Sequence, residues 1–248
     1  MRDQKHEFAL YFEQLSQNFS KAGKLIILDP ELVQRLFKIL RLVPGDNLTL
    51  FNQNYFVDAQ ISLIDKKQLV LENLVWHNLA TLKPEITVAI GVLKKENFEN
   101  ALYSCVELGA NAILPIMFAK SAPTKLNHER VNKILISASE QSKNFSMPVW
   151  HEPILFHQFL AQIQKKQAIK TAYIYCDIHG KPMLPIISQI KSQVYEKIVL
   201  IVGPEGDLTS EEQAQLAEQH VFSMQLTPTV LRSFQAVTVA LGACRSLL

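Results

Sequence analysis

Two short loops in the last quarter of the chain carry residue types that could hold a small molecule. Gly203-Pro204-Glu205-Gly206 follows Lys197–Val202, a short apolar run rich in β-branched residues. The two glycines lack side chains, so a tight turn here would let another molecule approach the backbone. The second loop runs from Leu226 to Arg232 and directly follows another predicted strand, Phe222–Leu226. Together the loops predict a binding site built from backbone groups, aliphatic walls and one arginine.

Other site chemistries lack their characteristic motifs. The sequence contains no Gly-x-Ser-x-Gly elbow, no Walker loop and no Gly-x-Gly-x-x-Gly fingerprint, which argues against hydrolase, NTPase and Rossmann dehydrogenase functions. The histidines show no metal-ligand spacing with cysteines or acids, so no metal site is predicted. The three cysteines lie far apart in apolar runs, which is typical of reduced core residues; they are Cys105, Cys176 and Cys244.

The elements around the two loops predict how they are positioned. Lys197–Val202 is typical of a strand buried on both faces of a parallel sheet. Thr209 precedes Glu212 by three residues, the spacing of a capping box, and predicts a helix running to about His220. After the Phe222–Leu226 strand, the Leu226–Arg232 loop leads into an apolar terminal helix. We therefore expect both loops at neighbouring strand ends on one edge of the sheet, where α/β folds bind ligands.

A structural interpretation of the same residues stays open. The glycines could simply make a turn, Glu205 could be a solvated acid, and Arg232 could cap a surface.

Before Pro84 the pattern is that of a small β domain. Four strands are predicted, at Leu25–Leu28, Leu48–Phe51, Tyr55–Ile64 and Gln68–Leu74. The third alternates apolar and polar residues with period two. A short helix from about Pro30 to Leu40 interrupts the strands. The expected architecture is a curled antiparallel sheet forming a small barrel over residues 1–83.

From Pro84 onward strands and helices alternate, which favours an α/β domain with a parallel sheet over residues 84–248. A helix is predicted from Glu96 to Leu108, ended by Gly109. The terminal helix has an apolar stripe and a largely uncharged remaining surface. This favours burial on more than one side, including against a second subunit. The predicted strands are Ile86–Leu93, Ala112–Met117, Thr171–Cys176, Lys197–Val202 and Phe222–Leu226.

Composition and charge limit the classes of function that the chain can have but do not identify one. The 248 residues are 48% hydrophobic, with a formal net charge of +2 and a pI near 8.3. Nucleic-acid binding is therefore allowed but not demanded, and any basic surface must be local. No secretory signal or membrane-spanning run is apparent. We expect a cytoplasmic protein with no membrane partner.

The two loops resemble the signature of the RsmE family, which belongs to the SPOUT class of methyltransferases. In that family a strand ends in Gly-Pro-Glu-Gly-Gly, and a later loop reads Leu-Gly-x-x-Ile/Val-Leu-Arg followed by Thr-Glu-Thr. The resemblance implies methylation of N3 of a uridine in 16S ribosomal RNA, with S-adenosyl-L-methionine as cofactor. The matching residues are Gly203, Pro204, Glu205, Gly206, Leu226, Val230, Leu231 and Arg232.

The resemblance extends over nearly the whole chain in the same order. Ile39–Asp46 is similar to a segment of the family's N-terminal PUA-like barrel, whose implied role is RNA binding. Glu107-Leu108-Gly109 and Glu140-Gln141-Ser142 resemble two further segments. The resemblance also implies a trefoil knot in the C-terminal SPOUT domain and a homodimer with active sites at its interface. The RNA-binding residues that it implies are Arg2 and Arg41. Lys120 is a further RNA-binding candidate, because it belongs to a loose basic set that could face an RNA backbone, with solvated surface charge as the alternative; the set is Lys94, Lys95, Lys120, Lys125, Arg130 and Lys133.

Site roles follow from the resemblance and from the chemistry. Uracil N3 is a weak nucleophile until its proton leaves, and a cation near O2 or O4 would stabilise the developing anion. Arg232 is the candidate catalytic residue, with a structural arginine bonded to loop carbonyls as the alternative. The expected cofactor-binding residues are Val202, Gly203, Glu205, Gly206, Leu226, Thr227, Val230 and Leu231.

The chain also departs from the family pattern. Ser233-Phe234-Gln235 stands where the family has Thr-Glu-Thr, so an acid is lost and a large aromatic gained. Asp207 and Thr227 replace glycines, Asn144 an arginine and Ser104 a lysine. Two alternatives therefore stay open: a member that binds RNA or forms a dimeric scaffold without methyl transfer, and a SPOUT enzyme with another RNA target.

Overall fold

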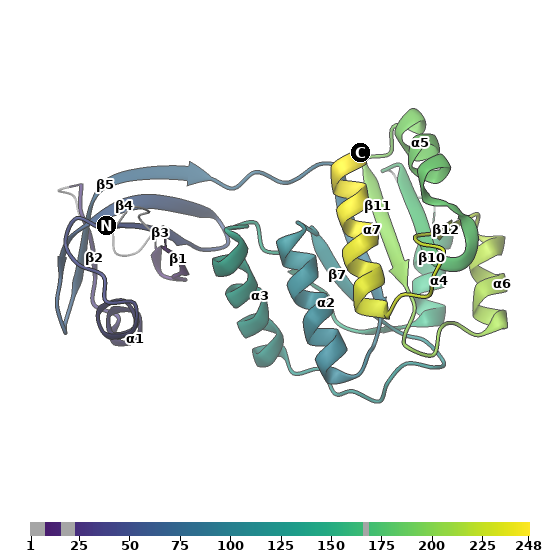
Figure 1. Cartoon of the computed structure of the whole chain (residues 1–248), viewed down its shortest axis with the longest axis horizontal. Coiled ribbons are helices and arrows are strands. Elements are labelled where there is room, and N and C mark those ends of the chain that lie inside the picture. The colour runs from purple at the N-terminus through teal and green to yellow at the C-terminus, as the bar shows by residue number, and fades with distance from the viewer. Residues whose placement is uncertain (1–7, 16–22, 166–168) are drawn as a thin grey trace. The chain divides into compact units, whose positions relative to one another are not determined.

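The computed structural model describes residues 8–15, 23–165 and 169–248, and divides into two units. The N-terminal unit comprises residues 1–80 and 139–146, and the C-terminal unit comprises residues 81–138 and 147–248. Figure 1 shows the secondary structure of both. Arg2, predicted to contact RNA, lies outside the described residues.

The N-terminal unit is built on a five-stranded sheet in the order β1-β3-β4-β5-β2. The sheet is mixed rather than wholly antiparallel, because β1, which the sequence did not predict, pairs parallel to β3. In β4 the predicted alternation is confirmed through Val57, Ala59 and Ile61, which are buried. It was wrong at Leu63, which is exposed while Ile64 is buried, because the register with β5 shifts between Ile61 and Leu63. The strands are β1 Phe8–Tyr11, β2 Leu25–Ile27, β3 Asn47–Phe51, β4 Tyr55–Ile64 and β5 Leu69–Asn78.

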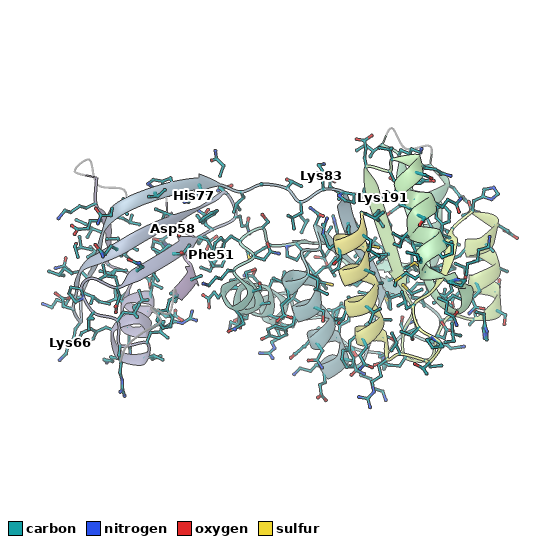
Figure 2. The ribbon with its side chains drawn as sticks, turned by 45° about the horizontal axis from the view of Figure 1, so that its top comes forward. Phe51, Asp58, Lys66, His77, Lys83 and Lys191 are labelled. Atoms are coloured by element: carbon teal, nitrogen blue, oxygen red, sulfur yellow. The ribbon has the colours of Figure 1, made fainter. Side chains whose placement is uncertain are left out.

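On this sheet Asp58 and His77 lie on the paired strands β4 and β5 (Figure 2). His77 Nε2 is 3.0 Å from Asp58 Oδ2, while Thr49 Oγ1 donates a 2.6 Å hydrogen bond to Asp58 Oδ1. Both carboxylate oxygens of Asp58 therefore face a polar neighbour on an adjacent strand.

The predicted helix after β2 is confirmed, but its second half is wider than an α-helix. Asp29 Oδ1 accepts a 2.7 Å hydrogen bond from Leu32 N and caps helix α1, Pro30–Gln34. The π-helix η2, Arg35–Ile39, continues it. Arg41 follows with φ +53° and is exposed, so the chain turns sharply there.

A second segment completes the N-terminal unit. Glu140 accepts two hydrogen bonds from the Arg35 guanidinium, at 3.0 and 2.6 Å, and one of 3.1 Å from Tyr11 N. Phe145 packs on Phe51, with ring centroids 4.8 Å apart. These contacts explain why residues 139–146 belong to this unit.

The C-terminal unit contains a seven-stranded parallel sheet in the order β12-β10-β11-β6-β7-β8, with β9 also paired to β7. All five strands predicted for this half are confirmed, within a few residues at their ends. The strands are β6 Glu85–Gly91, β7 Ala112–Met117, β8 Val149–Trp150, β9 Ile154–Leu155, β10 Thr171–Pro182, β11 Lys197–Val202 and β12 Phe222–Gln225.

Both faces of this sheet are covered. In β11, Ile198 and Leu200 face the core beneath α2, α3, α5 and α7, while Val199 and Ile201 face the core beneath α4 and α6. Helices α2 and α7 pack side by side (Figure 1). The helices are α2 Lys95–Glu107, α3 His128–Ser142, α4 Phe156–Gln164, α5 Met183–Gln193, α6 Ser210–Glu218 and α7 Ser233–Leu247.

Arginine and lysine side chains fix the end of α7. Arg245 donates to the carbonyls of Gly109 and Pro84 at 2.7 and 2.6 Å. Lys191, labelled in Figure 2, donates from α5 to Leu247 O at 3.1 Å. Carbonyls at the end of a helix lack intrahelical donors, and the Lys191 bond satisfies one of them.

The expected position of the two loops was wrong in one respect. Strands β11 and β12 are not neighbours, because β10 lies between them and pairs with both. Residues 177–180 bulge out of β10, since Cys176 and Lys181 both pair with Met224. A Cβ on Gly180 would lie 2.6 Å from Met224 N, so only glycine lets the bulge close against β12. Three strand ends, rather than two, therefore meet at this edge.

Candidate small-molecule site

A cavity of about 410 Å³ lies at the carboxyl ends of β10, β11 and β12. Eight of the nine residues predicted to bind cofactor or act in catalysis line it: Val202, Gly203, Glu205, Leu226, Thr227, Val230, Leu231 and Arg232. A further wall comes from the first turns of α2 and α7, through Asn97, Ser233 and Ala236. Its size falls within the range of about 300–1,000 Å³ typical of small-molecule sites.

Close backbone packing positions the loop after β11, which lines the cavity. A Cβ on Gly91, the last residue of β6, would lie 2.6 Å from Pro204 N and 2.8 Å from Pro204 Cδ. One on Gly203 would lie 2.9 Å from Leu208 Cδ1. The loop after β11 thus lies against the end of β6 because Gly91 lacks a side chain, and Gly203 lets the same loop fold back on Leu208.

Asp207 gives the same loop its final turn. Its φ of +58° is in the left-handed region, which glycine, asparagine and aspartate adopt most readily. Asp207 Oδ1 accepts hydrogen bonds of 2.7 Å from the Tyr175 hydroxyl and 2.7 Å from Leu208 N. Burial, together with the nearby Asp207 carboxylate, raises the pKa of the Tyr175 hydroxyl, which therefore stays a donor. The glycine-like turn is thus held by a side-chain clamp from β10.

Glu205 is tied to the start of α2. Its Oε1 accepts hydrogen bonds of 2.9 Å from both Lys94 N and Asn97 Nδ2. Partial burial opposes ionisation, but the hydrogen bonds from Asn97 and the Lys94 backbone outweigh it and hold the pKa of Glu205 below its ordinary value. Glu205 is therefore an ionised, oriented wall residue.

Arg232 begins the last helix at the mouth of the cavity. Its backbone N donates to Gln235 Oε1 at 3.4 Å, and its side chain is exposed. Within the described part of the chain, no hydrogen bond or ion pair of its guanidinium is found. The alternative of a structural arginine bonded to loop carbonyls thus has no such bond among these residues to support it.

Among the lining residues that the sequence did not predict, three come from β10, at or directly before its bulge. They are Cys176, Asp177 and Ile178. Asp177 accepts hydrogen bonds from Ser223 Oγ at 2.8 Å and His179 N at 2.9 Å. Burial raises the pKa of the Cys176 thiol, so it stays protonated and is not a nucleophile. The sequence signal for this wall was Asp177, an aspartate directly after the apolar predicted strand Thr171–Cys176.

Gly206 does not line the cavity and instead faces an adjacent groove. Lys120 packs on it and donates from Nζ to the carbonyls of Gly206 and Leu208 at 3.0 and 3.3 Å. Lys94 and Lys95 line the same groove, and Glu205 lies on the wall shared with the cavity. A lysine-rich groove therefore adjoins the candidate site.

The predicted RNA-binding residues thus have different positions. Lys120 lies in this groove, Arg41 lies on the N-terminal unit, and Arg2 is outside the described residues. In the part of the chain that the structure describes, no cluster of three or more potential metal ligands is found. No helix among those residues is long and apolar enough to cross a membrane.

A parallel α/β sheet with a glycine-walled cavity at its carboxyl edge defines a class of small-molecule-binding α/β proteins. A family model described as an RNA methyltransferase domain matches residues 81–245, which include the whole cavity. The chain therefore belongs to this RNA methyltransferase family.

Individual relatives are distant but similar over their full length. The ribosomal RNA small subunit methyltransferase E of Rickettsia conorii is 27% identical over 236 residues, 94% of each chain. A Legionella pneumophila protein solved with bound SAM is 25% identical, with a TM-score of 0.73 over 97% of both chains. The S-adenosyl methionine-bound methyltransferase E of Neisseria gonorrhoeae is 24% identical, with a TM-score of 0.77 over 98% of both chains, and shows the fold alone.

Proposed function

We propose that this protein is an S-adenosyl-L-methionine-dependent methyltransferase acting on N3 of a uridine in 16S ribosomal RNA. The observation that most strongly supports this assignment is the cavity at the carboxyl ends of β10, β11 and β12. It gathers eight of the nine predicted cofactor-binding and catalytic residues at the carboxyl edge of the sheet, within the segment that matches the RNA methyltransferase family. Relatives that span 94% of the chain carry the name of a small-subunit rRNA methyltransferase.

The residues of the cavity fit the proposed cofactor. The volume of about 410 Å³ suits a ligand made of a purine, a ribose and an amino acid. Gly203 exposes backbone to the ligand, while Leu226 and Leu231 offer aliphatic surface for the purine. The carboxylates on the wall are suitable partners for an ammonium and for ribose hydroxyls.

Methyl transfer requires the protein mainly to orient the two reactants and to stabilise the charge that develops on the base. When bound, the cofactor supplies an electrophilic methyl group on a sulfonium sulfur. The N3–CH3 bond forms as the S–CH3 bond breaks, and the N3 proton leaves to solvent. Arg232, exposed at the mouth, would stabilise the negative charge that develops on uracil O2 or O4. Orientation of the two reactants by the walls supplies the remaining advantage.

Two basic regions are proposed to hold the RNA. Lys94, Lys95 and Lys120 border the groove beside Glu205, where they could neutralise phosphates flanking the target nucleotide. Arg41, exposed at a left-handed turn of the N-terminal unit, is a second phosphate contact. Arg2 belongs to the same proposal through the family resemblance. Such contacts position the RNA, whereas the cavity would select the base.

The remaining parts of the proposal concern architecture. We propose residues 1–83 as a PUA-like RNA-binding barrel and residues 84–248 as a SPOUT domain whose C-terminal segment forms a trefoil knot. A homodimer with active sites at its interface and a cytoplasmic location complete it. The parallel sheet in which β10 separates β11 from β12 is compatible with this arrangement.

The test has two stages. Calorimetric titration with S-adenosyl-L-methionine and S-adenosylhomocysteine should show saturable binding. Incubation of undermethylated small ribosomal subunits with enzyme and cofactor should then give N3-methyluridine, which blocks base pairing and stops primer extension at one position. A folded protein that binds neither ligand would refute the proposal.

A second candidate is a member that binds RNA without methylating it. Phe234 replaces the family's acid and packs against the core, while Ser104 shares a 2.8 Å hydrogen bond with Thr238 instead of presenting a lysine. Cofactor binding without a primer-extension stop on any small-subunit RNA would favour this candidate. A stop in another RNA would identify a different target.

A further inference from the structure

The charges around the cavity are unbalanced. Three carboxylates line it, from Asp177, Glu205 and Asp207, whereas Arg232 is the one cationic side chain among the described lining residues. The carboxylates come from two segments: Asp177 from the β10 bulge, and Glu205 and Asp207 from the loop between β11 and α6. The cavity therefore carries an excess of negative charge from two sides of the sheet edge.

Hydrogen bonds fix these carboxylates in place. Tyr175 holds Asp207, Ser223 holds Asp177, and Asn97 holds Glu205, at 2.7, 2.8 and 2.9 Å. Charges held in this way need no reorganisation when a ligand enters, so their field acts at full strength. A flexible surface acid would instead turn toward water.

Among the three, Asp207 departs from the family signature. It stands where the signature loop described above has its second glycine, and its left-handed backbone shows why glycine suits the position. Both of its observed hydrogen bonds go to Oδ1. No hydrogen bond to Oδ2 is found among the residues that the structure describes, so this oxygen is available to a ligand in the cavity.

Methyl transfer changes the charge of the ligand. The donor carries a sulfonium, an ammonium and a carboxylate, for a net charge of +1. The product keeps the ammonium and the carboxylate but has a neutral thioether. We propose that Asp207, together with Asp177 and Glu205, makes this cavity charge-selective, so that it binds the cationic methyl donor in preference to its neutral demethylated product. The inference rests on the proposed function and adds how the site favours product release.

The size of the effect follows from Coulomb's law. A unit charge about 7 Å from the sulfonium, at an effective dielectric constant of about 40 to 80, changes donor affinity roughly three- to sevenfold. The neutral product gains nothing from the same charge at its sulfur. Salt should weaken the preference, because part of the cavity is open to solvent.

Matched variants test the inference by calorimetric titration with both ligands. Asp207→Asn keeps the shape, the acceptor for Tyr175 and the tolerance of a left-handed backbone, and removes only the charge. We expect it to weaken S-adenosyl-L-methionine binding roughly three- to sevenfold and to leave S-adenosylhomocysteine binding within about twofold. Asp177→Asn should act in the same direction. Glu218→Gln, an exposed acid of α6 that does not line the cavity, is the control and should change neither affinity.

The outcomes separate the two proposals. If the wild-type protein binds both ligands but Asp207→Asn weakens them equally or not at all, charge selection is wrong and the methyltransferase proposal stands. If the wild-type protein binds neither ligand, both proposals fail. Thermal melting of each variant within about 1–2 °C of the wild type shows that the fold is intact.

Discussion

The substitution Gly91→Ala probes how the cavity is built from a position that does not line it. Gly91 ends β6, and an added Cβ would meet Pro204 N at 2.6 Å, Pro204 Cδ at 2.8 Å and Gly203 C at 3.1 Å. These neighbours are backbone and ring atoms, so no flexible side chain can move aside. The φ of Gly91 is not in the left-handed region, so alanine meets no backbone penalty there. The whole effect should therefore be steric displacement of the loop after β11.

The magnitude can be bounded from packing. Forcing an extra methyl group into a packed region typically costs about 1–3 kcal/mol. For a chain of this size each kcal/mol lowers the melting temperature by roughly 2–4 °C, so a fall of about 2–12 °C is expected. A loop displaced by a few tenths of an ångström or more also misplaces Gly203 and Glu205. We expect at least tenfold weaker binding of S-adenosyl-L-methionine, equivalent to about 1.4 kcal/mol.

Gly242→Ala provides the matched control in the same unit. An added Cβ there would meet Leu108 Cδ1 at 3.9 Å, an ordinary contact. Gly242 lies inside α7, where alanine is favoured over glycine by roughly 0.5–1 kcal/mol. This variant should therefore melt slightly higher and bind the cofactor unchanged. If Gly91→Ala instead melts like the wild type and keeps its affinity, the tight approach of β6 to Pro204 is not what shapes the cavity.

Four other perturbations have defined outcomes. Arg232→Ala should lower the methylation rate about 100-fold and leave cofactor affinity within twofold, as compared by single-turnover kinetics and calorimetry; a normal rate would remove Arg232 from the chemistry. Tyr175→Phe removes the clamp on Asp207 and should lower the free energy of unfolding in urea by about 1 kcal/mol; an unchanged midpoint and slope would contradict that role. Arg41→Ala should reduce the slope of log affinity for RNA against log salt by about one, and an unaltered slope would exclude a phosphate contact. The folded-state pKa of Glu205 lies below its ordinary 4.5, so its contribution to stability is present above pH 4.5 and is lost as the pH falls through the folded value. In Glu205→Gln the free energy of unfolding should therefore depend less on pH in that acid range. Identical pH dependence in the two proteins would argue against the hydrogen-bonded carboxylate.

Local sequence patterns predicted the elements of the C-terminal unit well. The Thr209–Glu212 capping box is present, with Thr209 N donating to Glu212 Oε2 at 2.8 Å. The apolar run Lys197–Val202 forms β11 with the same bounds. Such features depend on a few consecutive residues, so the sequence alone reveals them. The helix at Met183–Gln193 was missed although it buries Ile186 and Ile190.

What the sequence could not supply was the order of the strands. The insertion of β10 between β11 and β12 depends on pairing between segments about 25 to 50 residues apart, for which no local pattern exists. As a result Asp177, placed in the wall by the β10 bulge, was not among the expected site residues. Gly206 was expected in the cavity because of its sequence neighbours, yet it packs on Lys120 in the adjacent lysine-rich groove.

The scattered origin of the cavity walls bears on how the protein becomes functional during synthesis. Asn97 and Ala236 border the same space although nearly the whole C-terminal unit lies between them in sequence. Contacts of such long sequence separation form late, because their loop-closure entropy must be overcome first. A nascent chain still lacking α7 has no complete cavity, so a partly made chain should be unable to capture methyl donor. The ability to bind methyl donor would then appear in a single step near the end of folding. A ligand that binds only the finished cavity would stabilise the native state by mass action.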